Sequence, residues 1–226
     1  MKKTVLAVAL AAVSASSFAA ETDSEEGYYG ALRYVNGNHH AKNMEVTSPR
    51  TLARVAANDR SDFNSGAVAL GYNWGNNWRT EAEYNFKTHD SFASYWYPFN
   101  ANANTMAVKS ERMMLNVYRD FPIAAGFSLF AMGGLGLTHY TVDGWQGTQA
   151  RRFATRSDTN LTWAAGAGAS YTFLEKFTAE VGYRYTDMGN IESGFNTYDN
   201  AAHARDEQMK ASLVSSEWYL GARMAF

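Results

Sequence analysis

The segment from Trp78 to Lys87, WRTEAEYNFK, carries charged or amide side chains at every second position. Glu81 and Glu83 are two residues apart, and Arg79 and Lys87 follow the same alternation. On an extended strand these side chains point to one face, where paired carboxylates can exchange protons, line a path for ions or form salt bridges. The alternate positions are aromatic or small, so the segment is typical of a strand with two unlike faces.

Charged residues on other candidate strands follow the same alternation, and together they predict one polar network. The network comprises Arg33, Arg79, Glu81, Glu83, Lys87, Arg112, Glu180, Arg184, Glu217 and Arg223. Buried charges are tolerated when they are paired and hydrogen-bonded, and near-equal numbers of acidic and basic groups supply that pairing. We therefore favour a structural network of salt bridges over a catalytic carboxylate pair or an ion path.

The histidines do not indicate an enzyme. They are His39, His40, His89, His139 and His203. Nucleophilic catalysis needs a base beside a nucleophile. Four of the histidines lie in or beside predicted loops, and His139 lies on the strand face opposite to the charged residues. No His-x-Ser-Asn segment of the lipid A deacylase type occurs. We predict no catalytic residues and no enzymatic activity.

No metal site, cofactor site or nucleic-acid site is predicted either. His39 and His40 would point to opposite faces of a strand, and the chain has no cysteine to complete a zinc site. The glycines of GGLG lie within a predicted strand rather than between a strand and a helix, so they do not match a phosphate-binding loop. A formal net charge of -2 gives no reason to expect nucleic acid as a partner.

The first residues have the composition of a secretory signal peptide. Two lysines precede a short apolar run from Val5 to Val13, and the small-residue stretch SASSFAA follows. We predict a signal peptide over 1–19, export through the general secretory route and one domain over 20–226, a length that suits a single all-β barrel.

Aromatic residues make up 15% of the chain, yet no apolar run is long enough for a membrane-spanning helix. Only strands closed into a barrel would then enter a membrane without unpaired backbone groups. Alternation with intervening turn signals predicts eight strands, at 27–37, 63–74, 78–88, 108–121, 127–140, 159–173, 177–187 and 212–226. The connections at 75–77, 122–126 and 174–176 are short and the others are long and polar, as in bacterial outer-membrane barrels.

Two considerations decide which face of each strand points into the barrel: the volume of the side chains and the free-energy cost of placing charges in lipid. An eight-stranded barrel has room for ordinary side chains only, and it would not hold the aromatic set, which includes Trp74, Trp78, Trp163 and Trp218. Arginine or lysine facing lipid near the midplane would cost about 2–4 kcal/mol each. We therefore predict an all-β, eight-stranded, antiparallel, transmembrane up-and-down β-barrel with charges in the lumen, short periplasmic turns and four long extracellular loops. A soluble lipocalin-like barrel is the alternative fold.

Aromatic residues gather beside the short turns and predict a girdle at one membrane interface. These residues are Tyr72, Trp74, Trp78, Phe121, Phe127, Tyr171, Phe173, Phe177 and Phe226. The last residues, YLGARMAF, resemble the C-terminal assembly signal of outer-membrane proteins, with Gly221, Met224 and Phe226 in the matching places and Tyr219 where a more polar residue is usual. The resemblance implies the barrel-assembly machinery as a partner.

In the order and spacing of FAMGGLGL, EVGYRYTDMG and GARMAF, the chain resembles the small eight-stranded outer-membrane barrels grouped with the opacity proteins and the transmembrane domain of OmpA. The resemblance implies location in the outer membrane of Gram-negative bacteria, among lipid and lipopolysaccharide. It also implies a surface adhesin, or a structural envelope protein, whose loops bind envelope ligands or a host-cell receptor or glycan. A narrow porin-like channel and a lipid-modifying enzyme are the alternatives.

Two of the predicted loops carry the candidate binding residues. The connection from His89 to Ala107 is rich in aromatic residues, and the connection from Thr141 to Asp158 is rich in arginine. We predict an adhesive patch with aromatic anchors and basic residues that steer toward anionic groups. Packing beneath the loops, with the arginines on lipopolysaccharide phosphates, is the alternative. The residues are Phe92, Tyr95, Trp96, Tyr97, Phe99, Arg151, Arg152 and Arg156.

Overall fold

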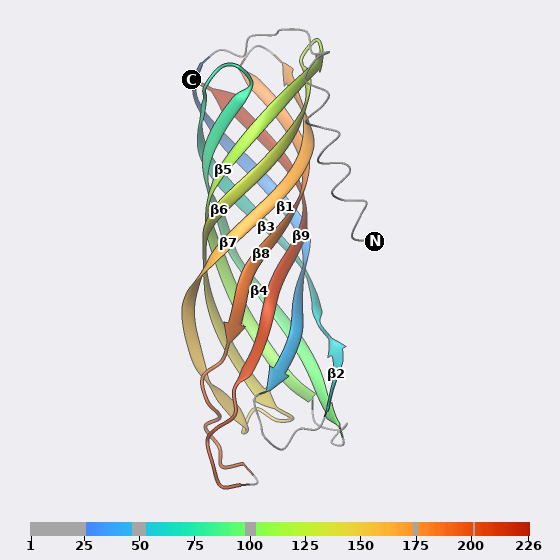
Figure 1. The fold of residues 1–226 in the computed structure, drawn as a ribbon, viewed down its shortest axis with the longest axis vertical. Coiled ribbons are helices and arrows are strands. Elements are labelled where there is room, and N and C mark those ends of the chain that lie inside the picture. The colour runs from blue at the N-terminus through green and yellow to red at the C-terminus, as the bar shows by residue number, and fades with distance from the viewer. Residues whose placement is uncertain (1–25, 47–52, 98–102, 174–175, 201) are drawn as a thin grey trace.

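The computed structural model describes residues 26–46, 53–97, 103–173, 176–200 and 202–226. The predicted signal peptide lies outside these residues, which contain no helix long and apolar enough to cross a membrane. They form nine strands, drawn in Figure 1. The strands are β1 (Gly27–Val46), β2 (Ala53–Asn58), β3 (Arg60–Asn73), β4 (Trp78–Tyr97), β5 (Ala103–Ala124), β6 (Phe127–Gln146), β7 (Arg152–Phe173), β8 (Phe177–Glu192) and β9 (Met209–Ala225).

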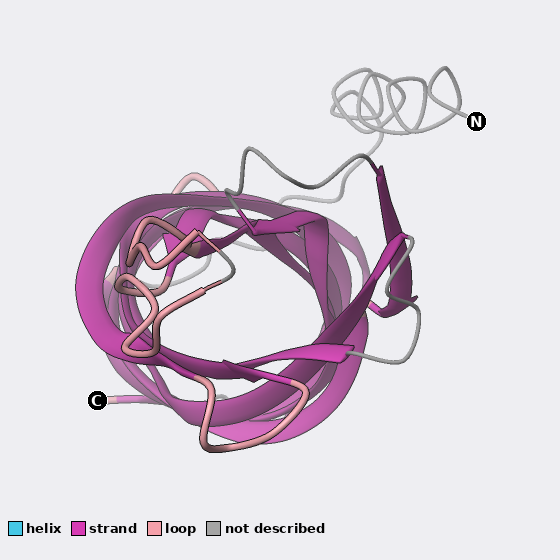
Figure 2. Ribbon diagram, turned by 90° about the horizontal axis from the view of Figure 1, so that it is seen from below, coloured by secondary structure: helices cyan, strands magenta, loops and turns pink. Residues whose placement is uncertain are grey.

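Eight long strands close into an antiparallel ring, which Figure 2 shows from one end. The order around the ring is β4, β3, β1, β9, β8, β7, β6 and β5, and β5 pairs with β4 to close it. The short β2 pairs with the far end of β4, beyond the segment that β3 covers. The predicted eight-stranded up-and-down barrel is confirmed.

The strands extend further toward the loop end of the barrel than the sequence patterns predicted. β4 continues to Tyr97 rather than 88, β5 begins at Ala103 rather than 108, and β6 continues to Gln146 rather than 140. The connection 193–208 between β8 and β9 remains long. The sequence patterns ended each predicted strand where its outward residues become polar. The strands instead continue past these positions, with polar residues outward and apolar residues inward.

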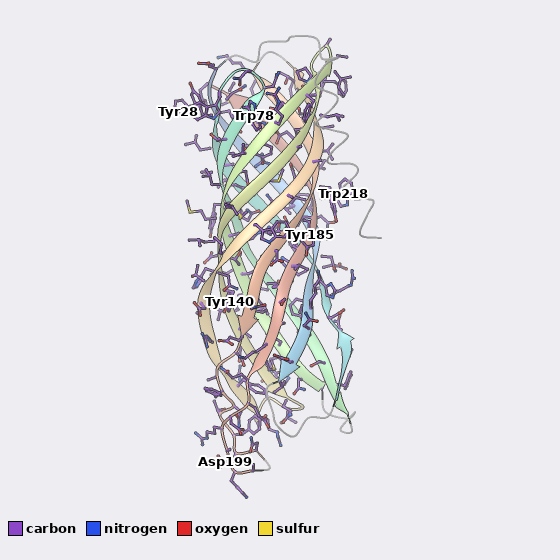
Figure 3. All side chains as sticks on the ribbon, in the orientation of Figure 1. Tyr28, Trp78, Tyr140, Tyr185, Asp199 and Trp218 are labelled. Carbon is purple, nitrogen blue, oxygen red and sulfur yellow. The ribbon has the colours of Figure 1, made fainter. Side chains whose placement is uncertain are left out.

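In the half nearest the short turns, the outward residues are apolar. Leucine, valine and methionine form a belt of Leu32, Val68, Leu70, Met113, Leu115, Val117, Leu135, Leu137, Leu161, Val181 and Leu220. Exposed aromatic residues lie at the turn end of this belt, where Figure 3 labels Tyr28 and Trp78, and again midway along the barrel, where it labels Trp218. A belt between two aromatic girdles is what a membrane-spanning barrel presents to lipid.

Beyond the belt the inward residues become apolar. They form a loop-end core of Ala41, Met44, Val46, Phe92, Met106, Val108, Tyr140, Val142, Phe153, Met188, Ile191, Met209, Ala211 and Leu213. A strand needs about 9–11 residues to span a bilayer, and β5 and β7 each have 22. About half of each of these strands therefore lies beyond the hydrocarbon region, where the core stabilises the ring in water.

Substitution of Phe92 tests the loop-end core, because the Phe92 side chain has 0% exposure. We expect Phe92→Ala to lower the free energy of unfolding by about 3–5 kcal/mol, the usual cost of a cavity left by a buried phenylalanine. Tyr95→Ala, on the same strand but 36% exposed, should change it by less than about 0.5 kcal/mol. Thermal unfolding in detergent, followed by gel mobility, measures both. Equal stability of the two variants would contradict the assignment of Phe92 to a core.

Candidate functional site

The lumen of the turn-end half is filled by charged side chains. Arg33 on β1 lies at the centre of this network: its guanidinium binds Glu81, and lies 2.5 Å from Glu83 and 3.1 Å from Glu180. All four side chains are almost completely buried. One arginine thus connects carboxylates from β4 and β8, which approach the lumen from different sides of the ring.

Arg79 forms a second group nearer the short turns. Its guanidinium lies 3.0 Å from Asp120 and 3.2 Å from Glu180, and its central carbon lies 3.7 Å from the centroid of the Tyr118 ring. Arg223 adds a third cation to Glu180 at 3.3 Å. Asp120 and Tyr118 were not among the predicted network residues, although both follow the alternation of Arg112 along β5.

Arg184 extends the network toward the loop end. It lies 2.8 Å from Glu217 and also contacts Glu83, and it donates a hydrogen bond of 2.6 Å to the side-chain oxygen of Asn85. Arg112 lies 2.5 Å from the second oxygen of Glu217. The four charged groups and the amide therefore form one connected assembly across β4, β5, β8 and β9.

The charged groups of this turn-end network match in number. The arginines are Arg33, Arg79, Arg112, Arg184 and Arg223, and the carboxylates are Glu81, Glu83, Glu180, Glu217 and Asp120. Each of these carboxylates contacts at least one arginine, so each buried negative charge has a partner of opposite sign. The arrangement suits a structural plug better than acid–base chemistry or an ion path.

Lys87 was expected in the lumen and lies on the outer wall instead. Its side chain is half exposed, and its ammonium lies 3.6 Å from Glu111. The pairing of β4 with β5 shifts register between Asn85 and Thr88. A β-bulge of this kind inserts an extra residue and reverses the alternation, which is why a strict period of two assigned Lys87 to the wrong face.

Glycines on the lumen wall make room for the large side chains. A Cβ atom on Gly182 would lie 2.4 Å from the Tyr219 ring, and one on Gly71 would lie 2.4 Å from the Tyr29 hydroxyl. Because real Cβ atoms do not approach neighbours this closely, any larger residue would displace the tyrosines that pack against the arginines. Glycine at these two positions therefore leaves the space that the tyrosines occupy.

His39 occupies a position that the sequence patterns did not predict. It is buried in β1, where its Nδ1 lies 2.9 Å from Asp90 and its ring stacks on Phe63 at 4.0 Å. Hydroxyls of Thr88 and Ser110 lie 3.1 Å apart nearby, and Thr88 donates to Asp90. These residues separate the charged network from the loop-end core. Only the continued alternation of β1 beyond 37 would have indicated the burial of His39.

The described residues contain no group of three or more potential metal ligands. A cavity of about 620 Å³ does open at the turn end, lined by Tyr29, Asp120, Thr178, Arg223 and other residues beside the turns. The charged network and then the loop-end core lie beyond it along the axis. The cavity therefore forms a vestibule on the turn-end side of the charged network.

Of the predicted aromatic patch, the structure describes the side chains of Phe92 and Tyr95. Phe92 lies in the loop-end core, because β4 continues through a segment that was predicted to be a loop. Tyr95 is exposed. Trp96 and Tyr97 are placed on β4 by their backbone, and Phe99 lies outside the described residues.

The three predicted arginines occupy different surroundings. Arg151 stacks over the Tyr198 ring at 4.4 Å, and Arg152 lies 2.5 Å from Asp143. Arg156 is on the wall of β7, where it lies 2.6 Å from Glu192. Only the first two belong to the end of the barrel.

The connection 193–208 packs against that end. The backbone N–H of Ala154 donates to the carbonyl of Phe195 at 2.8 Å, and the N–H of Thr197 donates to the carbonyl of Arg152 at 2.9 Å. Tyr198 donates to Gln146 at 3.0 Å, and burial raises the pKa of its hydroxyl, which keeps the donor protonated. We call residues 146–153 and the described part of 193–208 the distal tip; Figure 3 labels Asp199 at its extreme end.

The predicted assembly-signal residues end β9. Met224 and Phe226 are exposed on the lipid-facing side, and the backbone N–H of Phe226 donates to the carbonyl of Tyr28 at 3.0 Å. Gly221 faces the lumen, where a Cβ would lie 3.1 Å from Arg33. Their recognition by assembly machinery stays a prediction.

A family model described as the outer membrane protein beta-barrel domain matches residues 5–205. No curated protein matches the chain. Among solved structures, the chain is similar to Neisserial surface protein A, with 17% identity, a TM-score of 0.55 and coverage of 88% of this chain and 97% of that one. It is also similar to the outer membrane protein OprG from Pseudomonas aeruginosa, with 11% identity, a TM-score of 0.57 and coverage of 90% and 99%.

The outer membrane protease OmpT from Escherichia coli is a third similar structure, with 9% identity, a TM-score of 0.51 and coverage of 93% of this chain and 100% of that one. At these identities the three likenesses establish the fold and leave the activity open.

Glu180 tests the charged network, since it contacts Arg33, Arg79 and Arg223. Glu180→Ala should lower the free energy of unfolding by about 3–5 kcal/mol, because buried guanidinium groups lose their partner. Val181→Leu, on the next residue and facing lipid, should leave it nearly unchanged. Unfolding in detergent compares the two. A Glu180→Ala barrel as stable as the wild type would overturn the assignment of Glu180 to a buried network.

The conductance of the barrel tests the closed lumen. Single proteins in planar bilayers should give no large, steady current, because charged side chains and an apolar core both block the axis. Phe92→Ala provides a comparison, since it removes volume from the core and leaves the charged network in place. A large, steady current through the wild-type barrel would show that the lumen is open.

Proposed function

The chain belongs to the outer membrane protein beta-barrel family, and from this premise we propose that it is a surface adhesin of the Gram-negative outer membrane. Its distal tip would bind an anionic glycan on another cell. The observation that carries this proposal is that the strands continue well past the lipid-facing belt around an apolar core. Such a core serves no transport through the lumen, but it supports a rigid platform away from the membrane.

The distal tip has the chemistry that an anionic ligand needs. Arg151 and Arg152 are exposed, and Phe195 is 52% exposed beside them. A guanidinium group binds carboxylate or sulfate groups through paired hydrogen bonds. The stacking of Arg151 on Tyr198 limits its side-chain freedom before binding, which reduces the entropy cost of association.

Hydrogen bonds extend this platform to the end of β4. Tyr95 is opposite Ala103 in the ladder, and the carbonyl of Ala103 accepts a hydrogen bond of 2.8 Å from Gly147. An exposed aromatic residue therefore lies on the same rim as the arginines. The proposal includes no catalytic role, since the carboxylates of the turn-end network are each paired with an arginine.

The proposal predicts that bacteria displaying the protein bind cells or immobilised sulfated glycans. Changing Arg151 and Arg152 together to serine should weaken this binding at least about tenfold, given ~1 kcal/mol or more for each charge-assisted contact, and added salt should weaken wild-type binding. Changing Lys42 and Arg60 to serine removes the same charge from the wall and should leave binding unchanged. Counts of bound cells give the measurement.

A second variant with Trp96 and Tyr97 changed to alanine tests the predicted aromatic anchors. Each variant must first be recovered folded at the surface. The adhesin proposal fails if wild-type cells bind no better than cells without the barrel, or if the arginine variant binds as well as the wild type.

A further inference from the structure

We propose that the outer wall of β4, β5 and β6 carries a binding site for phosphate groups of the outer-leaflet lipid. The site comprises Lys87 and His89 on β4, Lys109 on β5 and His139 on β6, and we call it the basic band. It is separate from the distal tip and does not depend on the adhesin proposal.

The position of the basic band follows from the order of outward residues along each strand. On β5 the lipid-facing Leu115 and Met113 are followed by Glu111 and Lys109. On β6 the lipid-facing Leu137 is followed directly by His139, and on β4 Phe86 is followed by Lys87 and His89. The basic groups therefore begin where the apolar belt ends, at the depth of the lipid headgroups.

Strand pairing brings these residues together. His89 is directly opposite Lys109, and Glu111 is directly opposite His139. Directly paired side chains have Cβ atoms about 4.5–5.5 Å apart, so the four basic groups lie on three adjacent strands within the width of a phosphorylated headgroup. The bulge that turns Lys87 outward adds it to this group.

The partners of these side chains leave positive charge available. Two carboxylates lie beside the band. Glu111 accepts a hydrogen bond of 2.7 Å from Tyr84 and contacts Lys87, whereas Asp158 on β7 interacts electrostatically with His139 but is itself bound by Arg156 at 3.1 Å. Among the described residues, no carboxylate lies within salt-bridge distance of Lys109. The Nδ1 of His139 is 3.2 Å from Thr159, and the His139 side chain is exposed on the wall.

The described outer wall of the other five strands lacks basic residues at the first outward positions beyond the belt. The first outward residues beyond the belt, all within the described part of the chain, are uncharged or acidic on the other five strands: Asn36 and Asn38, Asn64 and Asp62, Thr159 and Ser157, Asp187, and Ser216. Among the described residues, the wall cations Lys42, Arg60 and Lys210 on these other strands lie further from the apolar belt than the basic band does. A basic cluster next to an apolar membrane surface attracts anionic lipid, and in the outer leaflet the phosphates of lipid A are that anion.

The test uses the full-length barrel folded in detergent and titrated with lipid A or with the same lipid after removal of both phosphates. Lipid A should raise the unfolding temperature of the wild-type barrel, and the dephosphorylated lipid should raise it much less. Changing Lys87 and Lys109 together to glutamine should weaken the apparent affinity for lipid A about tenfold or more. Affinity for the dephosphorylated lipid should stay the same, which a merely structural effect would not produce.

Changing Lys42 and Lys210 to glutamine supplies the matched control, since both lysines lie on the wall of β1 and β9 and the same charge is lost. This variant should bind lipid A as the wild type does, and inorganic phosphate alone should not stabilise the barrel. The proposal is overturned if the two lipids bind equally, if the Lys87 and Lys109 variant keeps wild-type affinity, or if the control variant loses as much.

Discussion

A β-strand has two faces only, and the surroundings of this ring change from lipid to water partway along each strand. Because backbone pairing has to continue across that boundary, the side chains must exchange roles: outward residues turn from apolar to polar and inward residues turn from charged to apolar. Both halves of the barrel depend on this exchange. Salt bridges fill the lumen where the wall faces lipid, and an apolar core fills it where the wall faces water.

The same exchange decides how much the sequence could predict. In the lipid-facing half, charges such as Arg79 and Glu81 alternate with large aromatic residues. The volume of the aromatic residues and the desolvation cost of the charges therefore both predict aromatic residues outward and charges inward. Beyond it, alternation continues with weaker contrast: Met106 and Val108 alternate with alanine and threonine, and such a segment resembles a polar loop. The lengths of the strands and the burial of Phe92 and His39 were therefore missed, because this weaker alternation was interpreted as loop.

The candidate site shows a similar division. Alternation identified most of the charged network, because each member lies on a regular strand. It failed at Lys87, where one inserted residue reverses the faces. Asp120, which follows the alternation of β5 and completes the balance of charge around Arg79, was missing from the predicted network. The pairing of arginines with carboxylates across the ring depends on how the barrel closes and on the tilt of its strands. The sequence of a single strand does not indicate either of them.

The length of the projecting strands sets the reach of the molecule. About eight to ten residues beyond the belt, each rising about 3.3 Å on strands tilted by roughly 40°, lift the distal tip some 20–25 Å above the hydrocarbon. Neighbouring lipids in a Gram-negative outer leaflet carry sugar chains of their own. A barrel of fixed height competes with that sugar layer, so in the proposed adhesin role the length of the surrounding glycans, as well as the chemistry of the tip, would determine which partners can approach it.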